Sequence, residues 1–395
     1  MGRVPAQHAQ PVKLLYLPGQ EAKCGDDDGL GEPIKDHIAA WEWHVTRLKL
    51  PVVEGAKVVS VTRATASAAA AAAAAADEDL LLVKVEGNHH PSYVTRNVVG
   101  ATGPFQFSRV PEMAADLAAD VAQLTADSFR NEARLPEGAV LVVGSGQCGV
   151  QITEELALAG RRVYLATTPH PACPRSHRGR DMFVWMEDLG MINMPKTAFP
   201  NGPLRSPQPF IGPDHAISYH SLARLGVTLG RIEGFSGGDG GTTATFRANL
   251  PENLAAAQES HEAIRGMIER IRRKIEAGEL REEDLAPVEP DPAWEPHEPL
   301  LDAAVSAPTS LDLRQHGITS VLWCTGWGAD FSWMRLTDEP REALGGQAYP
   351  EDVRGPHPGM WWLGFPWLRH RASALICGFE EDAKHLVTSR SCDDL

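Results

Sequence analysis

A glycine-rich turn carries the clearest chemical signal in this sequence. Gly144, Gly146 and Gly149 have the GxGxxG spacing, which is typical of dinucleotide binding when a strand precedes it and a helix follows. Gly144 permits a tight turn, Gly146 leaves room for a pyrophosphate beside the backbone, and Gly149 lets the helix pack closely on the strand. Such a helix points free N–H groups and the positive end of its dipole at the phosphates. We therefore predict a dinucleotide site that also includes Ser145 and Gln147; the alternative is a glycine-rich turn in some other parallel sheet.

The segments on both sides of the turn have the pattern that such a site requires. Residues 139–143 read AVLVV, a continuous apolar run typical of a strand buried on both faces. After the turn, Ile152, Leu156 and Ala159 recur at helical spacing, and residues 162–166 predict the next strand. Together they predict a strand–helix–strand unit of about 30 residues.

The end of the second strand indicates which dinucleotide is bound. A site for NAD(H) usually has a carboxylate about 20 residues after the first glycine, but residues 165–170 read LATTPH and contain no acid. Arg175, Arg178 and Arg180 follow in an otherwise acidic chain, and guanidinium groups bind a 2′-phosphate through paired hydrogen bonds. The sequence therefore favours NADP(H), with Thr168 and these arginines as candidate contacts. The alternative for the arginines is a solvated surface loop.

No second catalytic group stands out. Ser145 lacks the GxSxG spacing of a nucleophile elbow, and His89 and His90 have no cysteine or carboxylate at ligand spacing. We assign no catalytic residue and expect no metal site.

Length, charge and cysteine content exclude several classes. The chain has 395 residues, which at roughly 150 residues per domain suggests two or three compact units. Its net charge of −15 without a long basic run argues against binding to nucleic acid. No apolar run reaches about 18 residues, the first 20 residues lack the pattern of a secretory signal, and the six cysteines contain no CxxC pair. We expect a cytoplasmic protein without a transmembrane segment.

Other segments are expected to form the elements around the site. The alanine-rich stretch 112–124 predicts a helix, the amphipathic pattern of 253–276 predicts another, and the prolines of 286–308 predict a linker or an extended wrap. The alanine run 68–76 is interpreted as an insertion in a hairpin. Short apolar runs predict strands at residues 51–62, 80–85, 93–100, 320–324 and 360–364.

Four motifs, in this order, resemble the class B flavin-dependent monooxygenases, and within them the branch of flavin-containing monooxygenase-like and potassium-transport flavoproteins. They are NVVGATGPF at 97–105, the glycine-rich turn within 138–156, WCTGWGAD at 323–330, and LGFPWL at 363–368 followed by GFEEDA at 378–383. The likeness spans about residues 51–386. The resemblance also implies further cofactor-binding residues: Ala101, Thr102, Gly103, Thr325, Gly326 and Gly364.

The resemblance implies an α/β fold of two doubly wound, Rossmann-like dinucleotide-binding domains. Residues 1–110 and 319–395, the latter beginning with a linker strand, would form a discontinuous FAD-binding domain, and residues 111–318 an NADP-binding domain. It also implies that NADPH reduces FAD, that O2 adds to the flavin, and that one oxygen atom passes to a nucleophilic small-molecule substrate.

One departure from the family concerns its first glycine motif. Family members open with a GxGxxG turn for FAD, and the nearest match in this chain, Gly29-Leu30-Gly31, has Ile34 at the third glycine position. We therefore expect the FAD domain to be incomplete at its N-terminus. The strands at 93–100 and 360–363 would then lack neighbours, which predicts poor solubility or pairing with another chain, as in a homo-oligomer.

Three hypotheses about function remain. The first is an NADPH- and FAD-dependent monooxygenase, and the second is a catalytically inactive NADP-binding remnant of that family. The third is a pyridine-nucleotide-disulfide type reductase, which the lack of a CxxC or CxxxxC pair disfavours.

Overall fold

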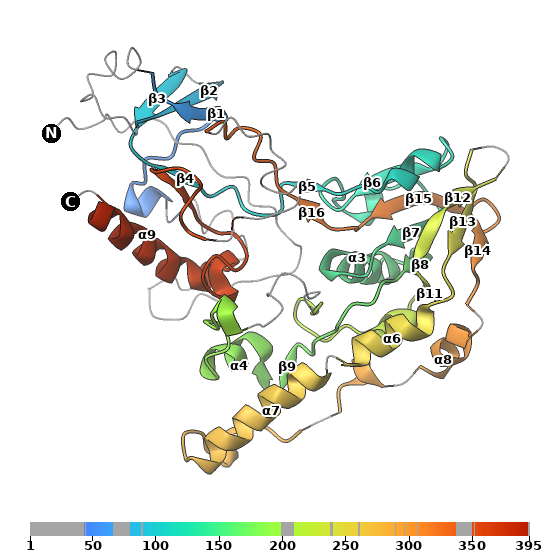
Figure 1. Ribbon diagram of the computed structural model, residues 1–395. Helices are drawn as coiled ribbons and strands as arrows, with labels where there is room; N and C mark the ends of the chain where they lie inside the picture. Colours follow the sequence, from blue (N-terminus) through green and yellow to red (C-terminus); the bar gives the residue numbers. More distant parts are fainter. Residues whose placement is uncertain are drawn as a thin grey trace. The chain divides into compact units, whose positions relative to one another are not determined.

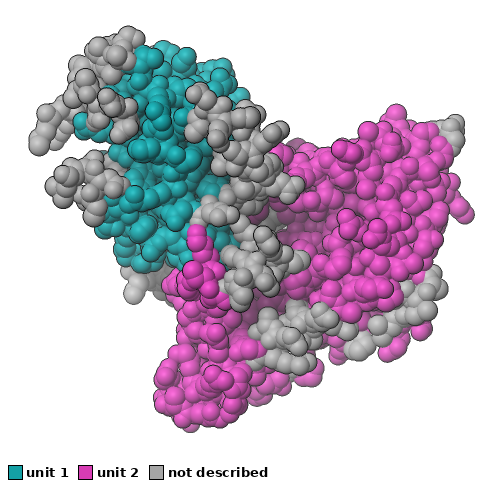
Figure 2. Space-filling view, viewed as in Figure 1, with its two compact units in different colours: residues 1–104, 329–395 teal, residues 105–328 magenta. Residues whose placement is uncertain are grey.

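The chain forms two compact units, which are described separately. Unit 1 comprises residues 1–104 and 329–395, and unit 2 comprises residues 105–328 (Figure 2). The alanine run 68–76 and the segment Gly29–Gly31 lie outside the described residues. The computed structural model describes residues 43, 45–65, 80–87, 90–198, 209–237, 240–259, 261–288, 290–295, 297–305, 307–336, 350 and 352–393.

Unit 2 is built on a five-stranded sheet with the order β11-β8-β7-β15-β6. All of its strand pairs are parallel, so the predicted α/β class is confirmed. The strands are β6 (Ala122–Thr125), β7 (Ala139–Val143), β8 (Val163–Ala166), β11 (Val227–Leu229) and β15 (Ile318–Trp323).

The central strand β7 is buried on both faces, as its apolar run predicts. Val140 and Val142 belong to the core on one side of the sheet, whereas Leu141 and Val143 belong to the core on the other side, because alternate side chains of a strand point in opposite directions. Helix α3 (Gln147–Leu158) covers the first face with Val150, Ile152 and Leu156, and Figure 1 shows it beside β7 and β8. Burial of each such side chain stabilises the fold by about 1.5–3 kcal/mol.

The second face of the sheet is covered by an antiparallel sheet. Its strands are β12 (Ile232–Ser236), β13 (Thr243–Phe246) and β14 (Ser310–Asp312), and their apolar residues share a core with Leu141 and Trp323. Unit 2 also contains the pair β5 (Phe107–Ser108) and β16 (Trp327–Gly328), the hairpin β9 (Ser176–His177) and β10 (Arg180–Asp181), and the helices α4 (Met182–Asp188), α5 (Tyr219–Ala223), α6 (Leu250–Glu259), α7 (His261–Glu276) and α8 (Glu298–Val305).

One helix prediction is corrected by tertiary contacts. The helix expected over 112–124 is wrong: a short 3-10 helix, Glu112–Asp116, is followed by the edge strand β6. β6 pairs with β15, and the Trp323 indole N–H donates to the Gln123 amide. These tertiary contacts outweigh the local helix propensity of the alanines. The helical prediction for 253–276 is confirmed on both sides of residue 260, which lies outside the described residues: α6 covers Leu250–Glu259 and α7 covers His261–Glu276.

The proline-rich stretch 286–308 is not wholly extended. It contains a 3-10 turn, Pro292–Trp294, and the helix α8. Pro299 lies in the first turn of α8, where its missing N–H would have no helical partner in any case. The prediction of a linker is therefore wrong for residues 298–305.

Unit 1 contains an antiparallel sheet and a short parallel pair. The sheet consists of β1 (Lys57–Arg63), β2 (Leu81–Glu86) and β3 (Ser92–Thr95). The parallel pair consists of β4 (Val98–Gly100) and β17 (Met360–Trp362), so two segments expected to lack neighbours pair with each other. Helix α9 (Phe379–Asp393) follows the 3-10 turns Arg371–Ala374 and Ile376–Gly378.

Within the ranges described for both units, no helix combines the length and the apolar character needed to cross a membrane.

Candidate functional site

The glycine-rich turn lies at the carboxyl edge of the parallel sheet of unit 2, between β7 and α3. The sheet order places β8 on one side of β7 and β15 on the other. The turn therefore sits at a topological switch point, where open parallel sheets bind their ligands. Helix α3 begins after Gly146, and no side chain caps its first N–H groups, so these donors can bind an anion.

The three glycines of the motif have different structural roles. A Cβ at Gly149 would lie 1.8 Å from the Gly144 carbonyl oxygen, and a Cβ at Gly144 would lie 2.4 Å from the Cys324 carbonyl oxygen. These two glycines are required by the backbone packing of the turn. At Gly146, among the described residues, an added Cβ would meet nothing closer than the His170 ring, at 3.7 Å. The fold therefore does not require a glycine at Gly146, and the uncovered backbone there suits the close approach of a diphosphate.

Ser145 faces the protein interior. Its side chain is fully buried, and its hydroxyl accepts a hydrogen bond from the Thr168 N–H at 2.9 Å and lies 2.7 Å from the Tyr219 hydroxyl. The structure thus brings Ser145 and Thr168 together through their contacts with each other. Sequence reasoning missed Tyr219, because no local pattern links residues 74 positions apart.

Gln147 attaches a distant segment to α3. Its side-chain oxygen accepts from the Ile211 N–H at 2.9 Å, and its amide nitrogen donates to the Ile211 carbonyl at 2.5 Å. Glu154 makes a second attachment, 2.9 Å from His215. Burial alone would lower the pKa of His215, but hydrogen bonds and charge attraction from Glu154 and Asp214 outweigh it and raise this pKa.

The three predicted arginines are each paired with a carboxylate. Arg178 binds Glu282 and the Ala286 carbonyl, and Arg180 lies 2.5 Å from Asp188 on α4. Arg175 lies 2.5 Å from Asp181 and 3.5 Å from the carbonyl oxygen of Gly212. Gly212 follows Ile211 in the segment that Gln147 holds, so of the three arginines Arg175 is the one connected to the glycine-rich turn by these contacts.

Thr325 and Gly326 follow β15 and join two segments of unit 2. The Thr325 hydroxyl donates to the Arg109 carbonyl, and the Arg109 N–H donates to the Gly326 carbonyl at 2.9 Å.

Burial raises the pKa of the Cys148 thiol and raises that of Cys324 well above its usual value. Both side chains therefore stay protonated near neutral pH, as expected of structural rather than redox-active cysteines.

The candidate flavin-binding residues of unit 1 lie at one edge of its parallel pair. Ala101, Thr102 and Gly103 follow β4, and Gly364 comes shortly after β17. Because parallel strands end at the same edge, the structure brings these residues together. Among the described residues of unit 1, however, no GxGxxG turn connects a strand to a helix. These residues do not supply the usual binding turn for the FAD diphosphate.

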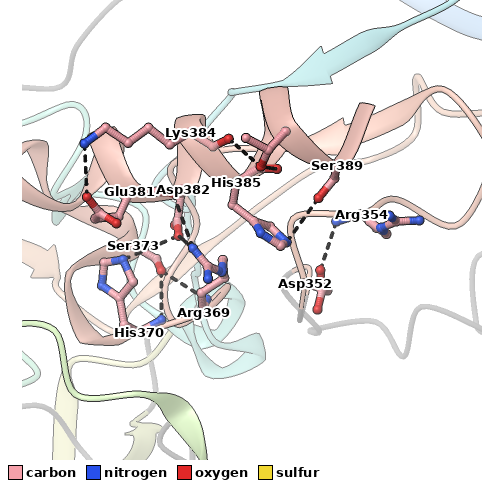
Figure 3. A network of polar contacts seen from close by, with 11 residues as sticks. Asp352, Arg354, Arg369, His370, Ser373, Glu381, Asp382, Lys384, His385 and Ser389 are labelled. Carbon is pink, nitrogen blue, oxygen red and sulfur yellow. Dashed lines mark hydrogen bonds and ion pairs between the residues drawn. The ribbon is translucent and has the colours of Figure 1, made fainter. Parts of the chain in front are cut away.

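A buried polar cluster lies at the first turn of α9 (Figure 3). Asp382 is fully buried, 3.4 Å from the Nε2 atom of His370 and 4.0 Å from the Arg369 guanidinium. Ser373 accepts hydrogen bonds from the backbone N–H groups of Arg369 and His370. Within the described structure, neither carboxylate oxygen of Asp382 and neither ring nitrogen of His370 makes a hydrogen bond. Asp382 lies in the GFEEDA run, but the sequence gives no sign of this pairing.

Comparisons with known proteins find similarity to a monooxygenase family model, to oxidoreductases and to the folds of flavin monooxygenases. A family model described as L-lysine 6-monooxygenase/L-ornithine 5-monooxygenase matches residues 39–169. The protein named "Uncharacterized oxidoreductase CzcO-like" from Geobacillus kaustophilus is 27% identical over 381 residues, covering 95% of this chain and 83% of the relative. "Uncharacterized oxidoreductase CzcO" from Bacillus subtilis is 23% identical over 378 residues, covering 94% of this chain and 82% of the relative.

Solved structures are similar in fold. A flavin-containing monooxygenase from Stenotrophomonas maltophilia superimposes with a TM-score of 0.50 at 16% identity, covering 90% of this chain and 76% of that chain. A mutant flavin monooxygenase from the same organism superimposes with a TM-score of 0.51 at 16% identity, covering 99% of this chain and 88% of that chain.

Proposed function

We propose that this chain, which is related to the flavin-dependent monooxygenases, uses its second unit to bind NADP(H). The observation that carries this proposal is the glycine-rich turn at the carboxyl edge of the parallel sheet. Within this turn, Gly144 and Gly149 are required by packing, whereas Gly146 is left open. A position that is bare without a packing reason is explained by a ligand that approaches the backbone there.

The diphosphate would bind to the backbone N–H groups at the start of α3. These groups lack a side-chain cap, and the helix dipole adds a favourable interaction of roughly 0.3–1 kcal/mol with a negative group. Arg175 is our candidate for the adenosine 2′-phosphate. Its present partner Asp181 also caps α4 by accepting from the Phe183 N–H. The Asp181 carboxylate therefore keeps a hydrogen bond when the Arg175 guanidinium turns toward a phosphate.

The proposed activity is that of an NADPH- and FAD-dependent monooxygenase acting on a nucleophilic small molecule with O2. FAD, when bound, would supply the chemistry that activates O2. We place FAD at the edge of the parallel pair of unit 1 that carries Ala101, Thr102, Gly103 and Gly364. The second candidate is an NADP-binding protein without this activity. It is favoured by the lack of a GxGxxG turn among the described residues of unit 1.

The proposal is tested by calorimetric titration of the protein with NADP⁺ and NAD⁺. We expect the wild type to bind NADP⁺ more tightly, and Arg175→Ala to lose about tenfold or more of that preference, because a charge-assisted hydrogen bond contributes about 1.5–3 kcal/mol. Arg178→Ala is the matched control and should keep the preference. Absence of binding heat with both coenzymes would refute the proposal, and an unchanged preference in Arg175→Ala would refute the role of Arg175.

The visible absorption spectrum of the purified protein separates the two candidates. A flavin band present in proportion to the protein supports the monooxygenase. A colourless protein that binds NADP⁺ and takes up no added FAD supports the second candidate.

A further inference from the structure

A buried polar network connects the glycine-rich turn to the start of α5. The Tyr219 hydroxyl lies 2.7 Å from the Ser145 hydroxyl oxygen and 3.1 Å from the Thr168 carbonyl oxygen. The Ser145 hydroxyl in turn accepts from the Thr168 N–H at 2.9 Å and lies 3.3 Å from the Thr168 carbonyl. The side chains of Ser145 and Tyr219 are almost completely buried, at 0% and 2% exposure.

The donors and acceptors of this network balance. The Thr168 N–H donates to Ser145, which leaves two hydroxyl hydrogens for the remaining contacts. Either Tyr219 donates to the Thr168 carbonyl and Ser145 donates to Tyr219, or Tyr219 donates to Ser145 and Ser145 donates to the carbonyl. Both arrangements satisfy every hydrogen, so the network fixes the backbone on both sides of the turn without leaving a buried polar group unpaired.

Tyr219 is itself held firmly. It is the first residue of α5, whose N-cap Ser218 accepts from the Ser221 N–H and whose Ser221 hydroxyl accepts from the Ser218 N–H. Its ring packs 5.4 Å from the ring of Phe210. Burial raises the pKa of Tyr219, so its hydroxyl keeps its proton at any ordinary pH.

The rings of Phe210 and His170 connect Tyr219 to the open position at Gly146. Phe210 stacks on His170, with 6.3 Å between ring centroids and 10° between ring planes. The His170 ring is the group that an added Cβ at Gly146 would approach, at 3.7 Å. Tyr219 thus contacts the turn directly through Ser145 and contacts His170 indirectly through Phe210.

We propose that Tyr219 is a positioning residue of the dinucleotide site. Its hydroxyl holds Ser145 and Thr168 in place, so the N–H groups around Gly146 are oriented before the diphosphate arrives. Preorganisation of this kind increases affinity because less order has to be created on binding. This inference rests on the proposed binding of NADP(H) at the glycine-rich turn.

The test is the dissociation constant for NADP⁺ of Tyr219→Phe, which removes only the hydroxyl. We expect binding to weaken about tenfold, because the turn becomes more mobile. The matched control is Tyr164→Phe on β8, which removes another largely buried hydroxyl, bonded to His316 at 3.1 Å and packed in the core on the opposite face of the sheet. Tyr164→Phe should bind NADP⁺ like the wild type, while its melting temperature changes by about as much as that of Tyr219→Phe.

Ser145→Ala provides a second, independent measurement. It removes the acceptor of the Thr168 N–H as well as the partner of Tyr219, so we expect a larger loss of affinity than in Tyr219→Phe. In the double variant the two losses should not add, because both changes break the same network. Ser145→Ala alone also tests the inference if Tyr219→Phe fails to fold.

Three results would overturn the inference. They are wild-type affinity in Tyr219→Phe, wild-type affinity in Ser145→Ala, and an equal loss of affinity in the Tyr164→Phe control. In each case the wild type binds NADP⁺ and the proposed function stands. If the wild type itself does not bind NADP⁺, the proposed function fails and this inference fails with it.

Discussion

The two units bury polar groups in opposite ways. At the glycine-rich turn of unit 2, Ser145, Tyr219 and the backbone of Thr168 satisfy one another completely. At the first turn of α9 in unit 1, Asp382 and His370 are buried side by side without a hydrogen bond between described residues. A satisfied network fixes one geometry, whereas a buried charge that lacks hydrogen bonds depends on the attraction of nearby charges. We infer that the turn is built for a fixed geometry, and that α9 is sensitive to the loss of a single charge.

The largest effect is expected from Gly149→Ala. The added Cβ would lie 1.8 Å from the Gly144 carbonyl oxygen, and neither backbone segment can move without disturbing the turn. We expect the free energy of unfolding to fall by at least about 3 kcal/mol, measured by urea denaturation. Gly266→Ala on α7 is the control, because its added Cβ meets nothing within 4 Å and alanine favours a helix by about 1 kcal/mol. A Gly149→Ala protein as stable as the wild type would contradict the packing described here.

The next effect concerns the buried pair in unit 1. Asp382 is fully buried and lies 4.0 Å from the Arg369 guanidinium. Removal of one partner of a buried ion pair typically costs about 3 kcal/mol or more, so Asp382→Ala should lower the free energy of unfolding by about that amount. Glu381→Ala, one residue earlier, removes an exposed carboxylate that pairs with Lys384, and should cost less than about 1 kcal/mol. Equal urea midpoints for the two variants would show that the charge of Asp382 contributes nothing to the stability of α9.

The smallest effect is a dependence on pH at the attachment between α3 and His215. The folded-state pKa of His215 is raised by Glu154 and Asp214. Its stabilising effect is therefore complete below the unfolded pKa of about 6.5 and is lost as the pH rises through the raised value. Because the side chain is half exposed, we expect less than about 1 kcal/mol.

The measurement is the difference in melting temperature between the wild type and His215→Gln. The difference should be greatest near about pH 6 and should vanish at alkaline pH. A constant difference across this range would show that protonation of His215 is not involved.

Local patterns predicted the strands and the helix around the glycine-rich turn correctly. The strand β7, the turn, α3 and β8 follow from an apolar run, three glycines and a helical repeat, all within about 30 residues. Contacts between distant parts of the chain account for what was missed. β6 forms because β15 offers it a partner 200 residues away, and Tyr219 reaches Ser145 only in the folded sheet. The carboxylate partners of the three arginines, such as Glu282 for Arg178, were equally invisible to local reasoning.

Titration of Gly146→Ala with NADP⁺ tests the central claim most directly. Since an added Cβ at Gly146 meets only the edge of His170, at 3.7 Å, we expect this variant to fold and melt like the wild type. We also expect it to bind NADP⁺ at least about tenfold more weakly, because the methyl group occupies the space of the diphosphate. Wild-type affinity in a normally folded Gly146→Ala protein would contradict the assignment of the dinucleotide site to this turn.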